Sequence, residues 1–213
     1  MSSDPPSDAR SSELEPAAGL AERVRARGTE LLEALERHVP GARDYADGTA
    51  AYAFAAAVEL ELDRDHAEAV RETARLHKVG CVYVPADVVA KPRGELTTHE
   101  QALLDSAFAS GAELARGAGI PDQVSDWIGA TRERFDGSGP AGLAGERIPI
   151  ESRIIRVACA CDTALAAPAA PCTSQDELRR MAVNALRAAA GSELDPRITA
   201  ALSTMLERAT AAK

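Results

Sequence analysis

Apolar residues recur at helical spacing along most of this 213-residue chain, and glycine or proline ends each run. The first run, which stops at Pro40-Gly41, carries Leu20, Val24, Leu31, Leu35 and Val39. Such spacing places the apolar side chains on one face of an α-helix. Aromatic residues make up only 3% of the chain while Ala and Leu are abundant, which favours helix over sheet. Segment 82–84 is extended but too short for a sheet, so the pattern predicts an all-α protein.

Capping signals divide the chain into about eight helices. Thr97 with Glu100, and Ser174 with Glu177, have the spacing of a capping box, and Asp195 precedes Pro196 as a cap for the last helix. Four glycines within residues 137–145 predict a shaped, irregular loop, and residues 87–96 predict a second one. We therefore expect a helical bundle with helices at 20–39, 43–62, 65–77, 97–115, from 121, 151–165, 174–190 and from 196.

Three regions are expected along the chain. Residues 1–19 are rich in Ser, Pro, Asp and Glu with hardly an apolar side chain, which is typical of a disordered tail. Residues 20–40 form an N-terminal helix, and residues 41–213 form one domain of sufficient length for a core. Residues 166–171 are an Ala/Pro linker within it.

Charge and cysteine usage limit the partners and the compartment. The net charge of −9 and the pI near 5.0 argue against direct binding of nucleic acid or of an acidic membrane. No secretory signal opens the chain, and no run approaches the roughly 18 apolar residues of a membrane-spanning helix. Cysteines 81, 159, 161 and 172 form no CxxC pair. We expect a cytoplasmic protein with reduced thiols.

Two stretches carry chemistry. Residues 76–85 read Leu-His-Lys-Val-Gly-Cys-Val-Tyr-Val-Pro, in which a helix reaches His77 and Gly80 breaks it. Residues 133–149 begin Glu-Arg-Phe-Asp-Gly-Ser-Gly-Pro and continue as the predicted glycine loop. The motif Lys-Pro-x-Gly-x-Leu-Thr at 91–97 lies between them, and Asp-Pro at 195–196 follows.

In order and spacing, these four motifs resemble those of the HD-GYP domain phosphodiesterases, and the resemblance runs from about residue 43 to residue 206. It implies an all-α HD-domain bundle in which His and Asp side chains from several helices hold two or three metal ions. In that family the metals activate water to attack a phosphodiester, usually that of cyclic di-GMP.

The resemblance also assigns the family's metal-ligand positions to this sequence. His77 keeps the central histidine, while Lys78 stands where the family has aspartate. The other ligand positions hold Tyr45, Ala107, Thr131, Arg132 and Cys159; Cys81 replaces a signature lysine, and the Gly-Tyr-Pro triplet reads Gly139-Pro140-Ala141. One imidazole cannot hold a catalytic metal pair, and Lys78 adds a cation. We therefore expect no cofactor and a catalytically inactive, degenerate member that acts as a regulatory, ligand-binding or protein-interaction module in signalling.

The vacated pocket is expected to bind a ligand. Lys78 and Arg132 would supply the positive charge that metals supply in the family, so that a nucleotide or cyclic dinucleotide binds without hydrolysis. The predicted ligand-binding residues are Lys78, Lys91, Arg132, Arg134, Asp136, Gly137 and Gly139. Within the chain, Glu133, Asp136 and Asp162 are the carboxylates expected to pair with these cations. A protein partner or a second copy of the chain is the other expected partner.

The alternative is a metal-dependent phosphohydrolase, a cyclic di-GMP phosphodiesterase with a site rebuilt around His77 as the catalytic candidate. In that case His77, Cys81 and Cys159 would bind a divalent metal ion. A core-facing cysteine is more often a small apolar side chain, which weighs against this set. The other three histidines, His38, His66 and His99, are expected on the surface.

Overall fold

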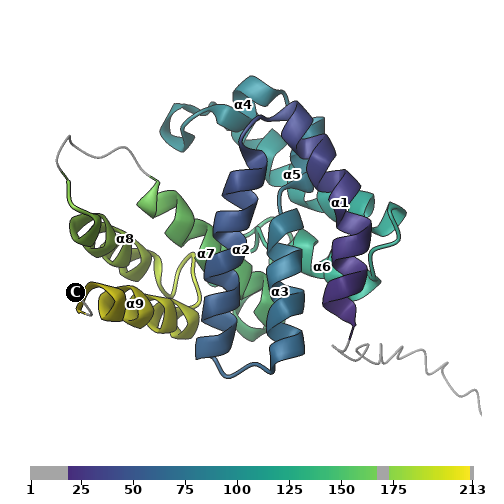
Figure 1. Cartoon of the computed structure of the whole chain (residues 1–213). Helices are drawn as coiled ribbons and strands as arrows, with labels where there is room; N and C mark the ends of the chain where they lie inside the picture. Colours follow the sequence, from purple (N-terminus) through teal and green to yellow (C-terminus); the bar gives the residue numbers. More distant parts are fainter. Residues whose placement is uncertain (1–18, 167–172, 212–213) are drawn as a thin grey trace, which may run out of the picture.

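The computed structural model describes residues 19–166 and 173–211, and within these ranges the protein is helical with no strand (Figure 1). The predicted all-α class is therefore confirmed. The predicted tail, apart from Gly19, lies outside the described residues, as do most of the predicted linker and Cys172. The α-helices are α1 (Leu20–His38), α2 (Ala42–Glu59), α3 (Arg64–Leu76), α4 (Ala86–Ala90), α5 (Thr98–Gly117), α6 (Asp122–Ala130), α7 (Ile150–Leu165), α8 (Gln175–Ala189) and α9 (Pro196–Ala211). Three 3₁₀ helices, η1 (Val79–Tyr83), η2 (Arg93–Glu95) and η3 (Gly145–Arg147), lie between them.

Helices α2 and α3 lie side by side at the centre of the molecule, and α7 packs behind α2 (Figure 1). Helix α2 contributes small side chains to this contact: Ala53 and Ala57 are fully buried. On α7, Ile154 and Ile155 are also fully buried, and each contributes about 1.5–3 kcal/mol by leaving water. One apolar cluster continues from these helices into α8 and α9, which form a pair on one side of the bundle (Figure 1).

Helix α1 packs along α3 on the opposite side of the bundle (Figure 1). Gly28 lies at this contact, and a Cβ atom there would lie 2.7 Å from Leu76 Cδ1, so the Leu76 side chain would have to shift. Leu20, Val24 and Leu32 are buried in the same apolar cluster as Leu76. The helix expected at 20–40 is thus an integral part of the packed bundle.

The segment expected to be extended, 82–84, is instead mostly helical. Residues Val79–Tyr83 form η1, and only Val84 has extended backbone angles. Gly80 does not simply end α3: a Cβ atom on it would lie 1.8 Å from the carbonyl oxygen of Ala107. The glycine therefore lets η1 lie against α5, and this packing wins over the extended preference of the valines.

The loop expected at 87–96 contains α4 and η2 rather than irregular chain only. Pro85, at the cap of α4, has φ of −50°, which favours the start of a helix, and Val88 buries its side chain. The predicted caps elsewhere hold. The capping box between Thr97 and Glu100 is complete, and Asp195 accepts hydrogen bonds from the first backbone amides of α9. Among the described residues, no helix is long and apolar enough to cross a membrane.

Candidate functional site

His77 lies at the C-terminal end of α3 and is only 1% exposed. Its Nδ1 atom is 2.6 Å from the carbonyl oxygen of Ala74. Because a carbonyl can only accept, Nδ1 carries a proton, and in the neutral ring Nε2 keeps a free lone pair. Nε2 is buried without a hydrogen-bond partner. A buried imidazole nitrogen of this kind is costly unless something outside the chain binds it.

Cys159, on α7, faces the His77 side chain. Burial alone raises the pKa of the Cys159 thiol, but hydrogen bonding and charge from His77, with the charge of Lys78, outweigh burial and lower it to about 5. Tyr45 on α2 lies 3.0 Å from the sulfur through its hydroxyl oxygen, which is also 3.2 Å from the Thr163 hydroxyl. The pKa of Tyr45 is raised, first by burial and then by the neighbouring Cys159. The result is a Cys159 thiol of low pKa paired with the His77 side chain.

Lys78 is half-buried and lies over Tyr45, with its ammonium nitrogen 3.8 Å from the ring centroid. The aromatic face partly offsets the loss of water around the cation. Arg132, 7% exposed, follows α6 and donates from Nε to Asp105 on α5 at 2.6 Å. The carboxylates that the sequence suggested as partners are engaged elsewhere, so this expectation is wrong for Arg132. Glu133 binds loop amides, Asp136 binds Ser138, and Asp162 accepts from Thr49.

Of these residues, Tyr45, His77, Lys78, Arg132 and Thr163 border a cavity of about 430 Å³, which we call the His77 cavity. Its walls come from the ends of α1 and α3, the start of α2, the α4–η2 segment and α5. The apolar lining includes Leu35, Val39, Leu104 and Phe108, and the polar lining comprises Tyr45, His77, Lys78, Lys91, Arg132 and Thr163. Lys91 is held at the rim by Glu100, 2.6 Å from its ammonium nitrogen.

The predicted ligand-binding residues divide into three groups. Lys78, Lys91 and Arg132 line the His77 cavity, whereas Arg134 and Gly139 line a second cavity beside it. The remaining two, Asp136 and Gly137, shape the glycine loop: Asp136 accepts from the amide and hydroxyl of Ser138, and Gly137 has a φ of +84°.

The glycine loop is held by Glu133, which is 3% exposed and accepts from the amides of Ala141 and Leu143 at 2.7 and 2.9 Å. Gly139 passes so close to it that a Cβ atom would lie 2.8 Å from Glu133 Cα. The start of the loop is tied to the α8–α9 turn through the amide of Phe135. The predicted irregular loop is therefore a tightly hydrogen-bonded structure.

Cys81 does not join His77 and Cys159. It packs in an apolar cluster with Leu35 and Val84, and burial raises the pKa of its thiol. Among the described residues, no three His, Cys, Asp or Glu side chains converge in a metal-binding cluster. The structure thus brings together two members of the predicted three-residue metal set.

Sequence reasoning missed two partners. Asp105, which pairs with Arg132, lies 27 residues away and gave no local signal. Thr163 follows Cys159 by one helical turn, so the expected helix 151–165 already placed both on one face. Of the histidines expected on the surface, His38 and His66 are partly exposed, and each has a partner: His38 lies 2.7 Å from the Val84 carbonyl oxygen, and His66 pairs with Glu151. His99 is exposed as expected.

Comparison with known proteins shows the family to which the chain belongs. A family model described as HD domain matches residues 25–198. The chain belongs to the HD domain family. The match begins within α1 and includes the His77 site and the glycine loop.

Curated relatives of this HD domain chain are phosphodiesterases by name. It is 34% identical over 149 residues to the cyclic di-GMP phosphodiesterase response regulator RpfG of Xanthomonas campestris pv. campestris, covering 68% of this chain and 39% of that protein. It is 37% identical over 100 residues to 3'3'-cGAMP-specific phosphodiesterase 2 of Vibrio cholerae, covering 46% of this chain and 19% of that protein. The chain spans well under half the length of these relatives.

Solved structures confirm the fold. Bd1817, an HD-GYP-type protein from Bdellovibrio bacteriovorus, matches with a TM-score of 0.67 at 18% identity, over 92% of this chain and 66% of that one. The PgpH HD domain of L. monocytogenes, in complex with cyclic-di-AMP, matches with a TM-score of 0.63 at 16% identity, over 84% of this chain and 94% of that one. The predicted HD-domain helical bundle is confirmed.

Family membership corrects one expectation: a chain without a cofactor. Because the HD-GYP phosphodiesterases that this chain resembles are metal-dependent, a metal ion is the cofactor that membership implies. Two of the residues present could hold one ion. Hydrogen bonding and charge from His77 lower the pKa of the Cys159 thiol, and His77 Nε2 has no other partner among the described residues, so a metal ion could displace the protons of both groups. Imidazole and thiolate together suit zinc or ferrous iron rather than magnesium.

Proposed function

We propose that this chain binds a cyclic dinucleotide in the His77 cavity and hydrolyses one of its phosphodiester bonds with a single divalent metal ion as cofactor. The observation that carries the proposal is the buried pair of His77 and the low-pKa Cys159 thiol, with His77 lining a cavity edged by cations. The names of the relatives support the substrate class.

The cavity's shape and charge suit such a ligand. Its volume of about 430 Å³ lies in the range of about 300–1,000 Å³ that small-molecule sites occupy. Apolar side chains such as Leu35 and Phe108 would contact a base, while Lys78 and Arg132 would bind phosphate oxygens. Lys91, already paired with Glu100, would contribute at the rim.

Each polar residue near the metal has a separate role. His77 and Cys159 would hold the ion, and the Ala74 carbonyl fixes the His77 tautomer that leaves Nε2 available. The Tyr45 hydroxyl holds the Cys159 sulfur in place. When bound, a divalent ion would act as a Lewis acid toward the phosphodiester and lower the pKa of water. Lys78, at the adjoining position, would hold the phosphate rather than the ion.

Binding without hydrolysis is the second candidate, and a specific observation favours it. Lys78 stands at the position where the family resemblance expects aspartate, and no third metal-binding side chain of the described residues joins His77 and Cys159. In that case the chain would be a regulatory module that senses the dinucleotide. Both candidates use the same cavity and differ only in turnover.

One experiment separates the candidates. The purified chain, loaded with zinc, ferrous iron or manganese in turn, is incubated with cyclic di-GMP, 3'3'-cGAMP and cyclic di-AMP, and the linear products are quantified. Hydrolysis that His77→Ala abolishes supports the first candidate. Saturable binding without product supports the second. A chain that neither binds nor hydrolyses any of the three contradicts both.

A further inference from the structure

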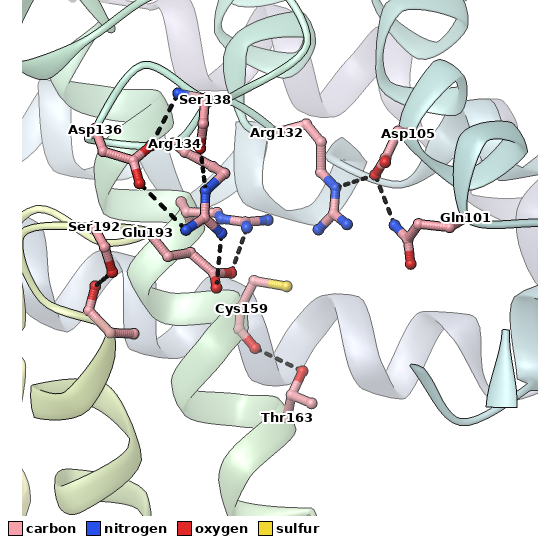
Figure 2. A network of polar contacts seen from close by, with 12 residues as sticks. Gln101, Asp105, Arg132, Arg134, Asp136, Ser138, Cys159, Thr163, Ser192 and Glu193 are labelled. Atoms are coloured by element: carbon pink, nitrogen blue, oxygen red, sulfur yellow. Dashed lines mark hydrogen bonds and ion pairs between the residues drawn. The ribbon is translucent and has the colours of Figure 1, made fainter. Parts of the chain in front are cut away.

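A second cavity, of about 590 Å³, lies beside the His77 cavity and shares one residue with it, Arg132. It is formed by α5, the glycine loop, α7 and the α8–α9 turn. Because its charged lining consists of Arg132, Arg134, Arg156, Asp105 and Glu193, we call it the arginine cavity. In Figure 2, Asp105 lies beside Arg132 on one side of this region, and Glu193 lies beside Arg134 on the other.

Arg132 is only partly satisfied by the described residues. Arg132 uses Nε for Asp105, but its Nη1 atom is buried without a hydrogen-bond partner (Figure 2). Arg134 contacts Glu193 at 3.3 Å and Asp136, which is outside the lining, at 3.4 Å. Arg156 pairs with the same Glu193. The lining therefore holds three guanidinium groups and two carboxylates, and the Asp136 carboxylate contacts Arg134 from outside it.

A buried N–H of a guanidinium group needs an acceptor, since its loss of water is costly. A planar guanidinium matches phosphate oxygens in pairs, and several arginines around one hollow favour a dianion over a single carboxylate. The hydroxyl of Ser138, which already accepts from Arg134, adds a further polar group at the same rim.

We propose that the arginine cavity binds a phosphate dianion, supplied either as inorganic phosphate or as the terminal phosphate of a nucleotide. This site shares Arg132 with the His77 cavity but does not depend on the hydrolysis proposed there. Arg132 Nη1 and the Arg134 guanidinium are its principal donors. A cyclic dinucleotide, which has no terminal phosphate, is not its ligand.

A charge placed at the rim tests the proposal without removing any arginine. Ala109 on α5 lines the cavity and is exposed, so Ala109→Glu introduces a carboxylate at a position that a helix tolerates. Ala109→Gln is the neutral control of nearly equal size. Titration calorimetry at constant ionic strength in chloride, with inorganic phosphate and with GMP, measures binding to the full chain. We expect Ala109→Glu to weaken binding by at least about tenfold relative to Ala109→Gln.

A second pair of variants tests the guanidinium itself. Arg134→Gln is expected to weaken phosphate binding by about tenfold or more, and Arg134→Lys by less, because the charge is kept. The exposed Arg180, which lies outside this cavity, supplies the matched control Arg180→Gln. Binding of both inorganic phosphate and GMP would mean that the free anion suffices. Binding of GMP alone would mean that the phosphate must belong to a nucleotide.

Three results would overturn the proposal: no saturable heat with either probe, equal affinity in the Ala109→Glu and Ala109→Gln variants, or loss of phosphate binding in Lys78→Met. The last result would place the anion in the His77 cavity, where Lys78 lies. Failure of dinucleotide hydrolysis with phosphate binding intact would contradict the proposed function alone.

Discussion

The glycine loop and the floor of the His77 cavity are both built around a buried ionisable side chain, but they satisfy it differently. In the loop, Glu133 is 3% exposed and accepts two backbone hydrogen bonds. At the cavity floor, His77 is 1% exposed and leaves Nε2 without a partner. The fold thus satisfies the Glu133 carboxylate fully and leaves His77 Nε2 without a hydrogen-bond partner. We infer that the loop stabilises the chain, whereas the cavity floor is available for binding.

The largest expected effect is on the loop. Glu133→Ala removes the acceptor for two loop amides, so the free energy of unfolding should fall by about 2 kcal/mol. Chemical denaturation of the parent and the variant measures the difference. Glu146→Ala, in the same loop but exposed, is the control and should change stability by less than about 0.5 kcal/mol. Equal losses in the two variants would show that Glu133 does not organise the loop.

At the His77 cavity we expect a substitution to lower ligand affinity rather than stability. Lys78→Met keeps the length of the side chain but removes its charge over Tyr45, so the free energy of unfolding should change by no more than about 1 kcal/mol. Cyclic dinucleotide affinity should fall by about tenfold or more, because a charged contact to phosphate is lost. Calorimetric titration and a melting curve on the same samples measure both. A large loss of stability with unchanged affinity would mean that Lys78 is structural.

His66 and His77 extend this comparison of satisfied and unsatisfied groups, and the expected effect on the free energy of unfolding is smaller. His66 lies 2.7 Å from Glu151 and stacks on Trp127, whereas His77 has its free nitrogen. The hydrogen bond with Glu151 raises the pKa of His66 above its ordinary value of about 6.5. The ion pair therefore stabilises the fold fully below about pH 6.5 and is lost as pH rises through the raised pKa.

The His66 side chain is still 28% exposed, so solvent screens the pair and we expect its contribution to stay below about 1 kcal/mol. Unfolding measured from pH 5.5 to 8.5 for the parent and His66→Gln should give curves that differ at the acidic end and converge at the alkaline end. A difference that grows toward alkaline pH would have the opposite sign and would contradict the assignment.

What the sequence predicted well is local. Thr97 and Glu100 cap α5 as expected because the two residues lie within one turn of each other, and Asp195 caps α9 for the same reason. The Arg132–Asp105 pair depends on how the end of α6 meets α5, and the 3₁₀ turn at Gly80 depends on contact with Ala107. Such contacts are set by packing between distant segments, which neither periodicity nor capping encodes. The order of the motifs was enough to indicate the family. Only the structure showed that Cys159 pairs with His77 while Cys81 packs in an apolar cluster.

The most direct measurement of the central claim, that His77 and Cys159 form a metal site, is the absorption spectrum of the chain loaded with cobalt(II). A thiolate bound to cobalt gives a charge-transfer band that needs neither substrate nor activity. We predict this band in the parent and in Cys81→Ala, and its loss in both Cys159→Ala and His77→Ala. No band in the folded parent, or a band that survives Cys159→Ala and disappears in Cys81→Ala, would contradict the account.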